Sequence, residues 1–333
     1  MIVLTNKHNI PLPLAAWLLD DDYDYNPDPK TFSASQLIKP SKKAILSSAV
    51  AVSPNIKVEI DITSKFAASR GQTIHAAIER ALRPEHLTNV ASKLGMNIPT
   101  LEAEERLKAE IEVDGEIYTV TGKFDATIDK VVTDWKNESV YAYQDKGKLL
   151  ERKYQLSLYA WLGHKNGKDW DTKVGHFYSI YQDWKEREAL KRGEESYPKS
   201  PMDLTVVPLF SFPSLENWIK SVIRERRDLT IEDVDSTLCS PKDLWQKEPV
   251  YQYFSKPDAA RASKNFATPQ EATAYLVSKG NKGIVKPKTT YAKACEYCLG
   301  NAICSQYQTL LAQGLIENES NAIPVRPAFG EDS

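Results

Sequence analysis

The spacing of apolar residues changes along the first half of the chain from a helical period to an alternating one. Over residues 64–82 apolar positions recur every three or four residues, which predicts a helix that starts near Gly71. A second helix is expected over residues 101–109. Apolar and polar residues then alternate over residues 111–128, and the Asp114–Gly115 dipeptide between the alternating runs predicts a β-hairpin.

The pattern after the hairpin alternates between strands and helices. We expect strands over residues 130–136, 174–184 and 203–210, and helices over 149–164, 214–229 and 269–279. A helix, antiparallel strands, a helix and a further strand in this order predict an α/β core with a mixed central sheet flanked by helices. Ser33 or Ser35 is placed to cap a short helix before this core.

These elements divide the chain into four predicted parts. Residues 1–63 form an N-terminal segment of helices and loops, and residues 64–235 form the core. Residues 236–316 form a C-terminal region that carries all four cysteines and packs on the core. Residues 317–333 are expected to be a flexible tail.

Composition and charge narrow the class of protein only slightly. A chain of 333 residues that is 41% hydrophobic buries a substantial core, and its net charge of −2 neither announces nor excludes a nucleic-acid groove with locally concentrated basic residues. The sequence has no apolar run of about eighteen residues, and its N-terminal apolar stretch is too short for a signal peptide or a spanning helix. We therefore expect a cytoplasmic protein that does not contact a membrane.

Two acids and a lysine follow the predicted hairpin turn. Asp134 and Lys136 are two positions apart on a predicted strand, so their side chains share a face while Trp135 turns away. If Asp125 ends the neighbouring strand, two carboxylates meet and need a counter-ion, and oxygen ligands suit Mg²⁺ or Mn²⁺. Lys136 would then orient a water or stabilise charge on a reacting phosphate. The alternative is that both acids end strands and Lys136 is a solvated partner.

Three residues on predicted helices fit the same site. His75 lies on the helix before the hairpin, and a neutral imidazole is a good additional ligand for a divalent ion. Gln155 and Tyr159 are four positions apart on the helix after the lysine strand, so their polar ends share one side of it. Each of the three taken alone also fits an ordinary position on a helix surface.

Taken together and in this order, these elements resemble the PD-(D/E)XK nuclease superfamily, and within it the RecB-type branch. The branch pattern is G-x3-H-x3-E on a helix, G-x2-D on a strand, (D/E)-x-K on the next strand and Q-x3-Y on the following helix. This sequence supplies Gly71, His75, Glu79, Gly122, Asp125, Asp134, Lys136, Gln155 and Tyr159. The resemblance covers residues 64–165, and its specificity comes from the ordered combination.

The resemblance implies a restriction-endonuclease-like core and a Mg²⁺- or Mn²⁺-dependent deoxyribonuclease. It implies that His75, Asp125, Asp134 and the backbone carbonyl of Trp135 bind the metal and that Lys136 is the catalytic lysine. Gln155 and Tyr159 would support the site or contact the DNA backbone. Glu79 would contact the metal-binding residues without binding the metal itself, or it would be a surface residue.

By the same resemblance the enzyme is an exonuclease or an end-processing nuclease in recombination, repair or replication of phage or bacterial DNA. Its partners would be DNA and a recombinase, a helicase or a single-strand-binding protein. One alternative is a catalytically silent nuclease fold that binds DNA or a protein. Another is a four-cysteine zinc protein with unrelated chemistry.

The cysteines lie close together in the last third of the chain. Cys295, Cys298 and Cys304 follow one another with two and then five residues between them, after a lone Cys239. In a reducing compartment such a group favours a metal over disulfides, and four thiolates suit Zn²⁺ or an iron–sulfur cluster. Several RecB-type nucleases, including the CRISPR-associated ones, look similar and hold a [4Fe–4S] cluster. The resemblance therefore implies such a cluster here, with Zn²⁺ as the alternative. Their fourth cysteine usually precedes the core, whereas Cys239 follows it.

Basic residues gather at three places in the sequence. These are residues 39–43, 146–153 and 224–227. The second group directly precedes Gln155, so we expect it to hold phosphates near the cleft, with a solvated helix start as the alternative.

Overall fold

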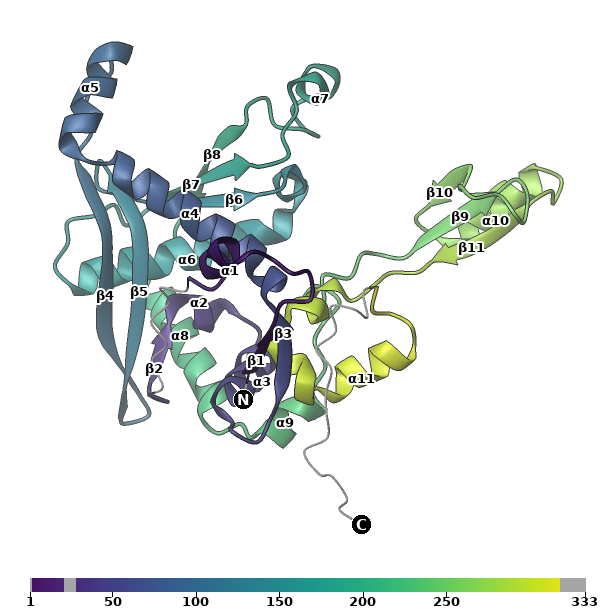
Figure 1. The fold of residues 1–333 in the computed structure, drawn as a ribbon, viewed down its shortest axis with the longest axis horizontal. Coiled ribbons are helices and arrows are strands. Elements are labelled where there is room, and N and C mark those ends of the chain that lie inside the picture. The colour runs from purple at the N-terminus through teal and green to yellow at the C-terminus, as the bar shows by residue number, and fades with distance from the viewer. Residues whose placement is uncertain (1, 21–27, 318–333) are drawn as a thin grey trace. The chain divides into compact units, whose positions relative to one another are not determined.

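The computed structural model describes residues 2–20 and 28–317 of the chain (Figure 1). The chain divides into two compact units. The sheet unit contains residues 6–39 and 65–228, and the cysteine unit contains residues 1–5, 40–64 and those from Leu229 on. The predicted tail beyond Glu317 lies outside the described residues.

The sheet unit is built on one six-stranded mixed sheet. Its strands have the order β2-β5-β6-β7-β8, and β4 pairs with β5. The strands are β2 (Thr31–Ser33), β4 (Leu101–Val113), β5 (Glu116–Ile128), β6 (Val131–Glu138), β7 (Val174–Tyr181) and β8 (Met202–Pro208). β2 is parallel to β5 and β6 is parallel to β7, whereas the other pairs are antiparallel. The predicted α/β fold with a mixed central sheet is confirmed.

Helices flank this sheet. They are α1 (Leu12–Leu18), α2 (Ala34–Ile38), α4 (Phe66–Ala81), α5 (Pro84–Leu94), α6 (Lys146–Lys165), α7 (Glu186–Lys191) and α8 (Phe212–Arg227), with a short 3₁₀ turn over Val140–Gln144. Ser33 caps α2 in a reciprocal pair of hydrogen bonds with Gln36, as the sequence predicted. α4 begins at Phe66, five residues before the predicted start near Gly71. Gly71 is tolerated inside the helix and does not interrupt it.

The hairpin of β4 and β5 is longer than the alternating pattern indicated. Asp114 and Gly115 adopt the left-handed φ angles of 52° and 84° that a tight two-residue turn requires. The prediction of a helix over residues 101–109 is wrong. Those residues are rich in helix formers, but cross-strand pairing with β5 outweighs their local preference. The helix in this region is α5, which the sequence reading missed.

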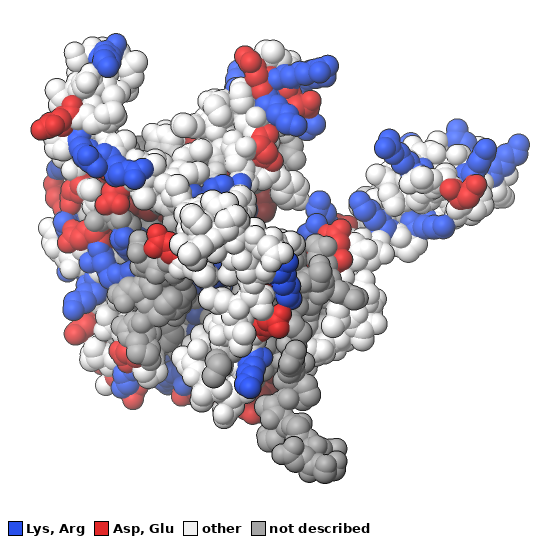
Figure 2. All heavy atoms as spheres, viewed as in Figure 1, with Lys and Arg blue, Asp and Glu red and all other residues white. Residues whose placement is uncertain are grey.

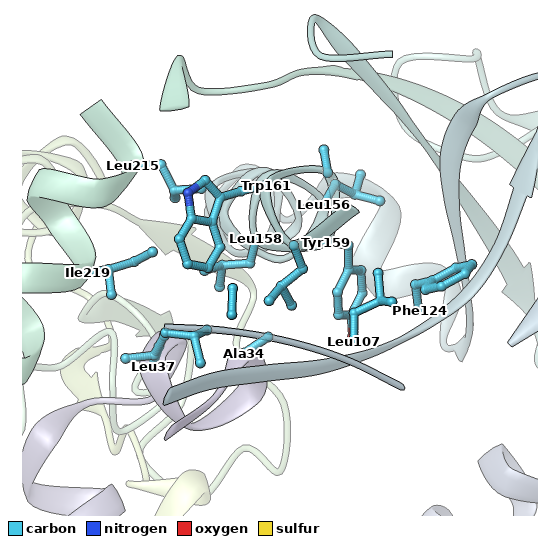
Figure 3. Close-up of a cluster of buried hydrophobic side chains, with 14 of the residues drawn as sticks. Ala34, Leu37, Leu107, Phe124, Leu156, Leu158, Tyr159, Trp161, Leu215 and Ile219 are labelled. Carbon is cyan, nitrogen blue, oxygen red and sulfur yellow. The ribbon is translucent and has the colours of Figure 1, made fainter. Parts of the chain in front are cut away.

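A single apolar core fixes α6 against the sheet. It joins α6 to the inner faces of β4 and β5 and to α8 and α2, as Figure 3 shows. Its residues include Ala34, Leu37, Leu107, Phe124, Leu156, Leu158, Tyr159, Trp161, Leu215 and Ile219. Because most of one side of α6 is buried in this way, the polar residues at its edge are held at fixed positions over β5 and β6.

The cysteine unit contains short elements around small clusters of buried residues. Its helices are α3 (Ser41–Val52), α9 (Ile231–Ser236), α10 (Pro269–Ser278) and α11 (Ser305–Ala312), with 3₁₀ turns at Ile62–Lys65, Lys293–Tyr297 and Leu299–Ile303. Its strands are β1 (Ile2–Thr5) parallel to β3 (Val58–Asp61), and β9 (Val250–Phe254), β10 (Lys264–Phe266) and β11 (Ile284–Lys288) in a second sheet. The helix predicted over residues 269–279 is confirmed as α10.

No helix in the described part of the chain has the length and the apolar character needed to cross a bilayer.

Candidate active site

A group of polar side chains lies where β5 and β6 separate. β5 pairs with β6 only over residues 126–128 and with β2 over residues 119–121, so residues 122–125 face no described strand on that edge. Asp125 is the last of these residues. Its Oδ2 accepts a hydrogen bond of 3.1 Å from the backbone N–H of Trp135 on β6. The carboxylate thus bonds a backbone group that has diverged from β5.

Asp134 and Lys136 share one face of β6, as their spacing predicts. Asp134 is fully buried, and its Oδ1 accepts hydrogen bonds from Lys136 Nζ at 3.0 Å and from Gln155 Nε2 at 2.9 Å. Gln155 Nε2 also donates to the hydroxyl oxygen of Tyr159 at 3.2 Å. The helix α6 therefore places both of its predicted polar residues beside the acid and lysine of the strand.

The second oxygen of Asp134 is in a different situation. Oδ2 is buried and has no hydrogen-bond partner among the described residues. Burial raises the pKa of Asp134 to about 6, against the opposing effect of the Lys136 ammonium, and the nearby Asp125 carboxylate adds to the rise. A buried carboxylate oxygen without a donor is costly, and a bound cation would relieve that cost.

His75, on the helix α4, contacts Asp125. Its imidazole Nδ1 lies 3.3 Å from Asp125 Oδ1, and its ring lies 6.4 Å from the indole of Trp135. Burial alone would raise the pKa of Asp125, but the hydrogen bond with His75 and the charge of Lys136 lower it below its usual value. Glu79 is exposed one turn further along α4. Asp125 therefore links the helix residue His75 to the two strands.

Lys136 is held as an ammonium group. Burial opposes its charge, yet the carboxylates of Asp134 and Asp125 raise its pKa above the ordinary lysine value. A lysine in this state donates hydrogen bonds and carries positive charge at any physiological pH. It is therefore suited to stabilise an anion or orient a water and unsuited to act as a base.

One residue of this region was missed from the sequence. Glu138 lies two positions after Lys136 on β6, and it accepts hydrogen bonds from Arg152 at 2.5 Å, from Ser179 Oγ at 2.7 Å and from Lys148 at 3.4 Å. The alternation that pairs Asp134 with Lys136 also predicts Glu138 on the same face. Two basic residues expected to hold phosphates are therefore bound to a carboxylate of the protein.

The four cysteines lie together within the cysteine unit. All four are free thiols, and all line one cavity of about 30 Å³. The amide side chain of Gln306 accepts from the backbone N–H of Cys239 at 2.7 Å and donates to its carbonyl at 3.1 Å. Asn301 Nδ2 donates to the carbonyl of Cys295 at 3.0 Å. Side chains of the unit thus fix the backbone around two of the cysteines.

Burial and the neighbouring thiols raise the pKa of Cys239 and of Cys295. Burial raises the pKa of Cys295 to about 12, and charge on the three neighbouring thiols adds to the effect. Burial likewise raises the pKa of Cys239, with Cys304 contributing. A bound cation would relieve this mutual repulsion. As they are placed, however, no three His, Cys, Asp or Glu side chains among the described residues form a group able to hold a metal ion.

Comparison with known families gives the superfamily of this chain. The model of the PD-(D/E)XK nuclease superfamily matches residues 96–305. The chain belongs to the PD-(D/E)XK nuclease superfamily. Members of this superfamily typically use Mg²⁺ or Mn²⁺. The matched range contains Asp125, Asp134, Lys136 and all four cysteines, whereas His75 lies before it.

Searches against individual proteins add less. A solved structure described as the crystal structure of SSO0001 is 18% identical, with a TM-score of 0.41, over 65% of this chain and 85% of that chain. No curated protein matches the chain at a significant level.

Proposed function

We propose that this superfamily member is a Mg²⁺- or Mn²⁺-dependent deoxyribonuclease whose active centre is formed by Asp125, Asp134 and Lys136. The observation that carries the proposal is the buried Oδ2 of Asp134, which has no partner among the described residues and lies beside a second carboxylate and an ammonium group. Two carboxylates with one lysine leave a negative charge uncompensated, which is the environment that a divalent cation needs.

The kinds of donor atom present suit such a cation, although as placed they form no group of three side chains able to hold it. After rearrangement the cation would be held by Asp134, Asp125, His75 and the backbone carbonyl of Trp135, where Asp125 now bonds Trp135 and His75 instead. When bound, the ion would supply positive charge to the phosphate and make a bound water more acidic.

The remaining side chains have separate tasks in this proposal. Lys136 donates to Asp134 and offers its other protons to the attacking water or to a phosphate oxygen. Gln155 orients the Asp134 carboxylate through Oδ1, and Tyr159 fixes the Gln155 amide in turn. Asp134 Oδ1 is thus engaged by the protein, and Oδ2 is left for the cation.

The finer assignment is to the RecB-type branch. The contact between His75 and Asp125 supports it, because that branch carries a helix histidine before the strand acid. The proximity of Gln155 and Tyr159 to Asp134 supports it as well. On this basis we infer an exonuclease or end-processing enzyme of phage or bacterial recombination, repair or replication, working with a recombinase, a helicase or a single-strand-binding protein.

The test is a nuclease assay on linear single- and double-stranded DNA labelled at either end, with Mg²⁺ or Mn²⁺ added. Asp134→Asn and Lys136→Met should each lower the rate by about 100-fold or more. The matched controls are Asp169→Asn and Lys130→Met, which change an exposed acid–lysine pair of the same unit and should leave the rate unchanged. DNA cleavage by Asp134→Asn at the wild-type rate would refute the proposal, and binding without cleavage by the wild type would indicate a silent nuclease fold.

For the cysteine unit we infer a thiolate-bound metal centre with a structural task. The shared cavity of the four thiols supports it, together with the hydrogen bonds that fix the backbone of Cys239 and Cys295. An iron–sulfur cluster would give a brown protein that absorbs at about 400 nm, whereas zinc would give a colourless protein with stoichiometric metal. Purified protein that contains neither metal after preparation without oxygen or chelator would refute this inference.

A further inference from the structure

The cysteine unit contains a small module with a charge unlike that of the rest of the chain. The lysine module comprises residues 250–288, which form β9, β10, α10 and β11 (Figure 1). It carries seven Lys and Arg residues against two acidic ones, a net charge of +5 in a chain whose total is −2. All seven basic side chains are exposed, at positions 256, 261, 264, 279, 282, 286 and 288. The module is therefore a local concentration of positive charge that the composition of the whole chain conceals.

These cations differ in their partners from several basic residues of the sheet unit that form ion pairs. In the sheet unit Arg224 and Arg227 both bind Asp114, and Lys168 binds two glutamates. No basic side chain of the lysine module forms an ion pair with any acid in the described part of the chain. In Figure 2 the exposed basic atoms over this module outnumber the acidic ones. Its positive charge is thus available to an anionic partner.

The two faces of the module's sheet have different neighbours. Tyr253 is buried on one face, where its ring lies 5.0 Å from that of Tyr275 on α10, and Phe266 lies 5.2 Å from the same ring. The strand register places Asn265, Gln252 and Lys286 side by side on the opposite face. The face opposite α10 is called the open face below.

The open face combines three kinds of side chain. Lys286 and Lys288 are exposed on it, and Lys286 Nζ lies 5.7 Å from the centre of the half-buried Phe254 ring. Gln252 Nε2 donates to Asn265 Oδ1 at 3.1 Å, which leaves further amide donors and acceptors beside the ring. An aromatic ring, amide groups and lysines with no ion pair in the described chain are the groups with which proteins hold a single nucleic-acid strand.

We propose that the open face of the lysine module binds a single-stranded segment of DNA. Lys286 and Lys288 contact its phosphates, and Phe254 stacks on an unpaired base. An acidic peptide would match the charge, but it has no base to stack on the half-buried Phe254 ring. The choice of DNA rests on the proposed function, but the binding itself needs neither a divalent ion nor Asp134.

The test measures binding of the full chain to a short labelled single-stranded oligonucleotide, with no divalent ion and no chelator added, over a range of salt concentrations. Replacing both lysines (Lys286→Gln with Lys288→Gln) removes two phosphate contacts. The affinity should fall about 20-fold at 0.1 M salt, and the slope of log affinity against log salt should decrease by about 1.4. The matched control, Lys93→Gln with Lys191→Gln, removes two exposed lysines of the sheet unit and should leave both quantities unchanged.

A second variant tests the ring. Phe254→Leu keeps an apolar side chain on the sheet but removes stacking, so affinity for the single strand should fall about fivefold or more with no change of salt slope. Wild-type affinity and slope in the double lysine variant, or an equal loss in the control, would overturn the proposal. A failure of the proposed nuclease function can be told apart from a failure of this binding proposal. It would appear in the nuclease assay, as cleavage by Asp134→Asn at the wild-type rate. The binding assay contains no divalent ion and reports nothing on cleavage.

Discussion

Replacing Gly122 by alanine tests how closely α6 approaches β5. A Cβ atom at Gly122 would lie 2.7 Å from Leu162 Cδ1 and 3.0 Å from Tyr159 Cε1. Both side chains are buried, so neither has free space into which to move. Overpacking of this kind costs about 1–3 kcal/mol, and the lower entropy of the unfolded alanine chain offsets about 0.5 kcal/mol of that. We expect Gly122→Ala to lower the free energy of unfolding by roughly 0.5–2.5 kcal/mol.

The chain supplies its own control for this substitution. Gly71 lies within α4, and a Cβ added there would meet no atom within 4 Å. Gly71→Ala should therefore stabilise the protein by about 0.5–1 kcal/mol, because alanine is the better helix former. Urea unfolding of the two variants, followed by circular dichroism and by tryptophan fluorescence, gives the two shifts in opposite directions.

Gly122→Ala should also disturb the side chains of the candidate active site. Displacement of the Tyr159 ring would disturb its contact with Gln155, which holds Asp134 Oδ1 at 2.9 Å. We expect Gly122→Ala to lose nuclease activity under conditions where it remains folded, and Gly71→Ala to keep it. A Gly122→Ala protein as stable as the wild type, or shifted in the same direction as Gly71→Ala, would contradict the close packing of α6 on β5.

Three further substitutions test other parts of the structure. Arg226 is buried and donates to backbone carbonyls of residues 36–39, so Arg226→Leu should lower the free energy of unfolding by roughly 2 kcal/mol in urea titrations. Burial raises the pKa of Asp235, but its hydrogen bonds and the ammonium of Lys42 lower it below 3.8. Asp235→Asn should therefore be less stable than the wild type at pH 7, and the difference should disappear as the pH falls through the folded pKa, below about 4. Chelator should lower the melting temperature of the wild type but not that of Cys295→Ser, and equal shifts would contradict a metal at the cysteines.

Much of the fold could be predicted because its signals are local. Asp114–Gly115 marks a turn by its own conformational preference, and the helical spacing of α6 and α10 appears within single segments. The signals of α5 were also present, since Pro84 opens it and Gly95 closes it in a left-handed conformation. The sequence therefore contained the start and stop signals of α5, although our prediction did not include this helix.

The strand β4 could not be predicted in the same way. Its residues 101–109 read as a helix because their glutamates, lysine, leucines and alanines all favour one. Their conformation is decided by β5, whose residues 120–128 provide a paired strand along their length. A partner that lies across a turn contributes nothing to a pattern sought within one segment.

The candidate site also has features that could be predicted from the sequence and features that depend on contacts between distant segments. The order of motifs in the sequence was enough to group Asp125, Asp134 and Lys136 in one candidate site. The structure adds the contacts that Asp125 makes with other parts of the chain. Trp135 donates its N–H to Asp125 because β6 has turned away from β5 at that point, and His75 arrives there from a helix more than forty positions earlier. The roles of these residues in catalysis remain a prediction.

The charged residues of the candidate site lie at the point where β5 and β6 stop pairing with each other. Where β5 and β6 pair, backbone groups satisfy one another and the side chains carry no charge, as in Ala126 and Val132. Where they diverge, a backbone N–H needs another acceptor, and a carboxylate supplies it at the expense of burying charge. Lys136 compensates one of the two acids, and Asp134 Oδ2 remains without a donor among the described residues. A core selected only for stability would place apolar residues there, so the uncompensated oxygen argues for a site maintained by its chemistry.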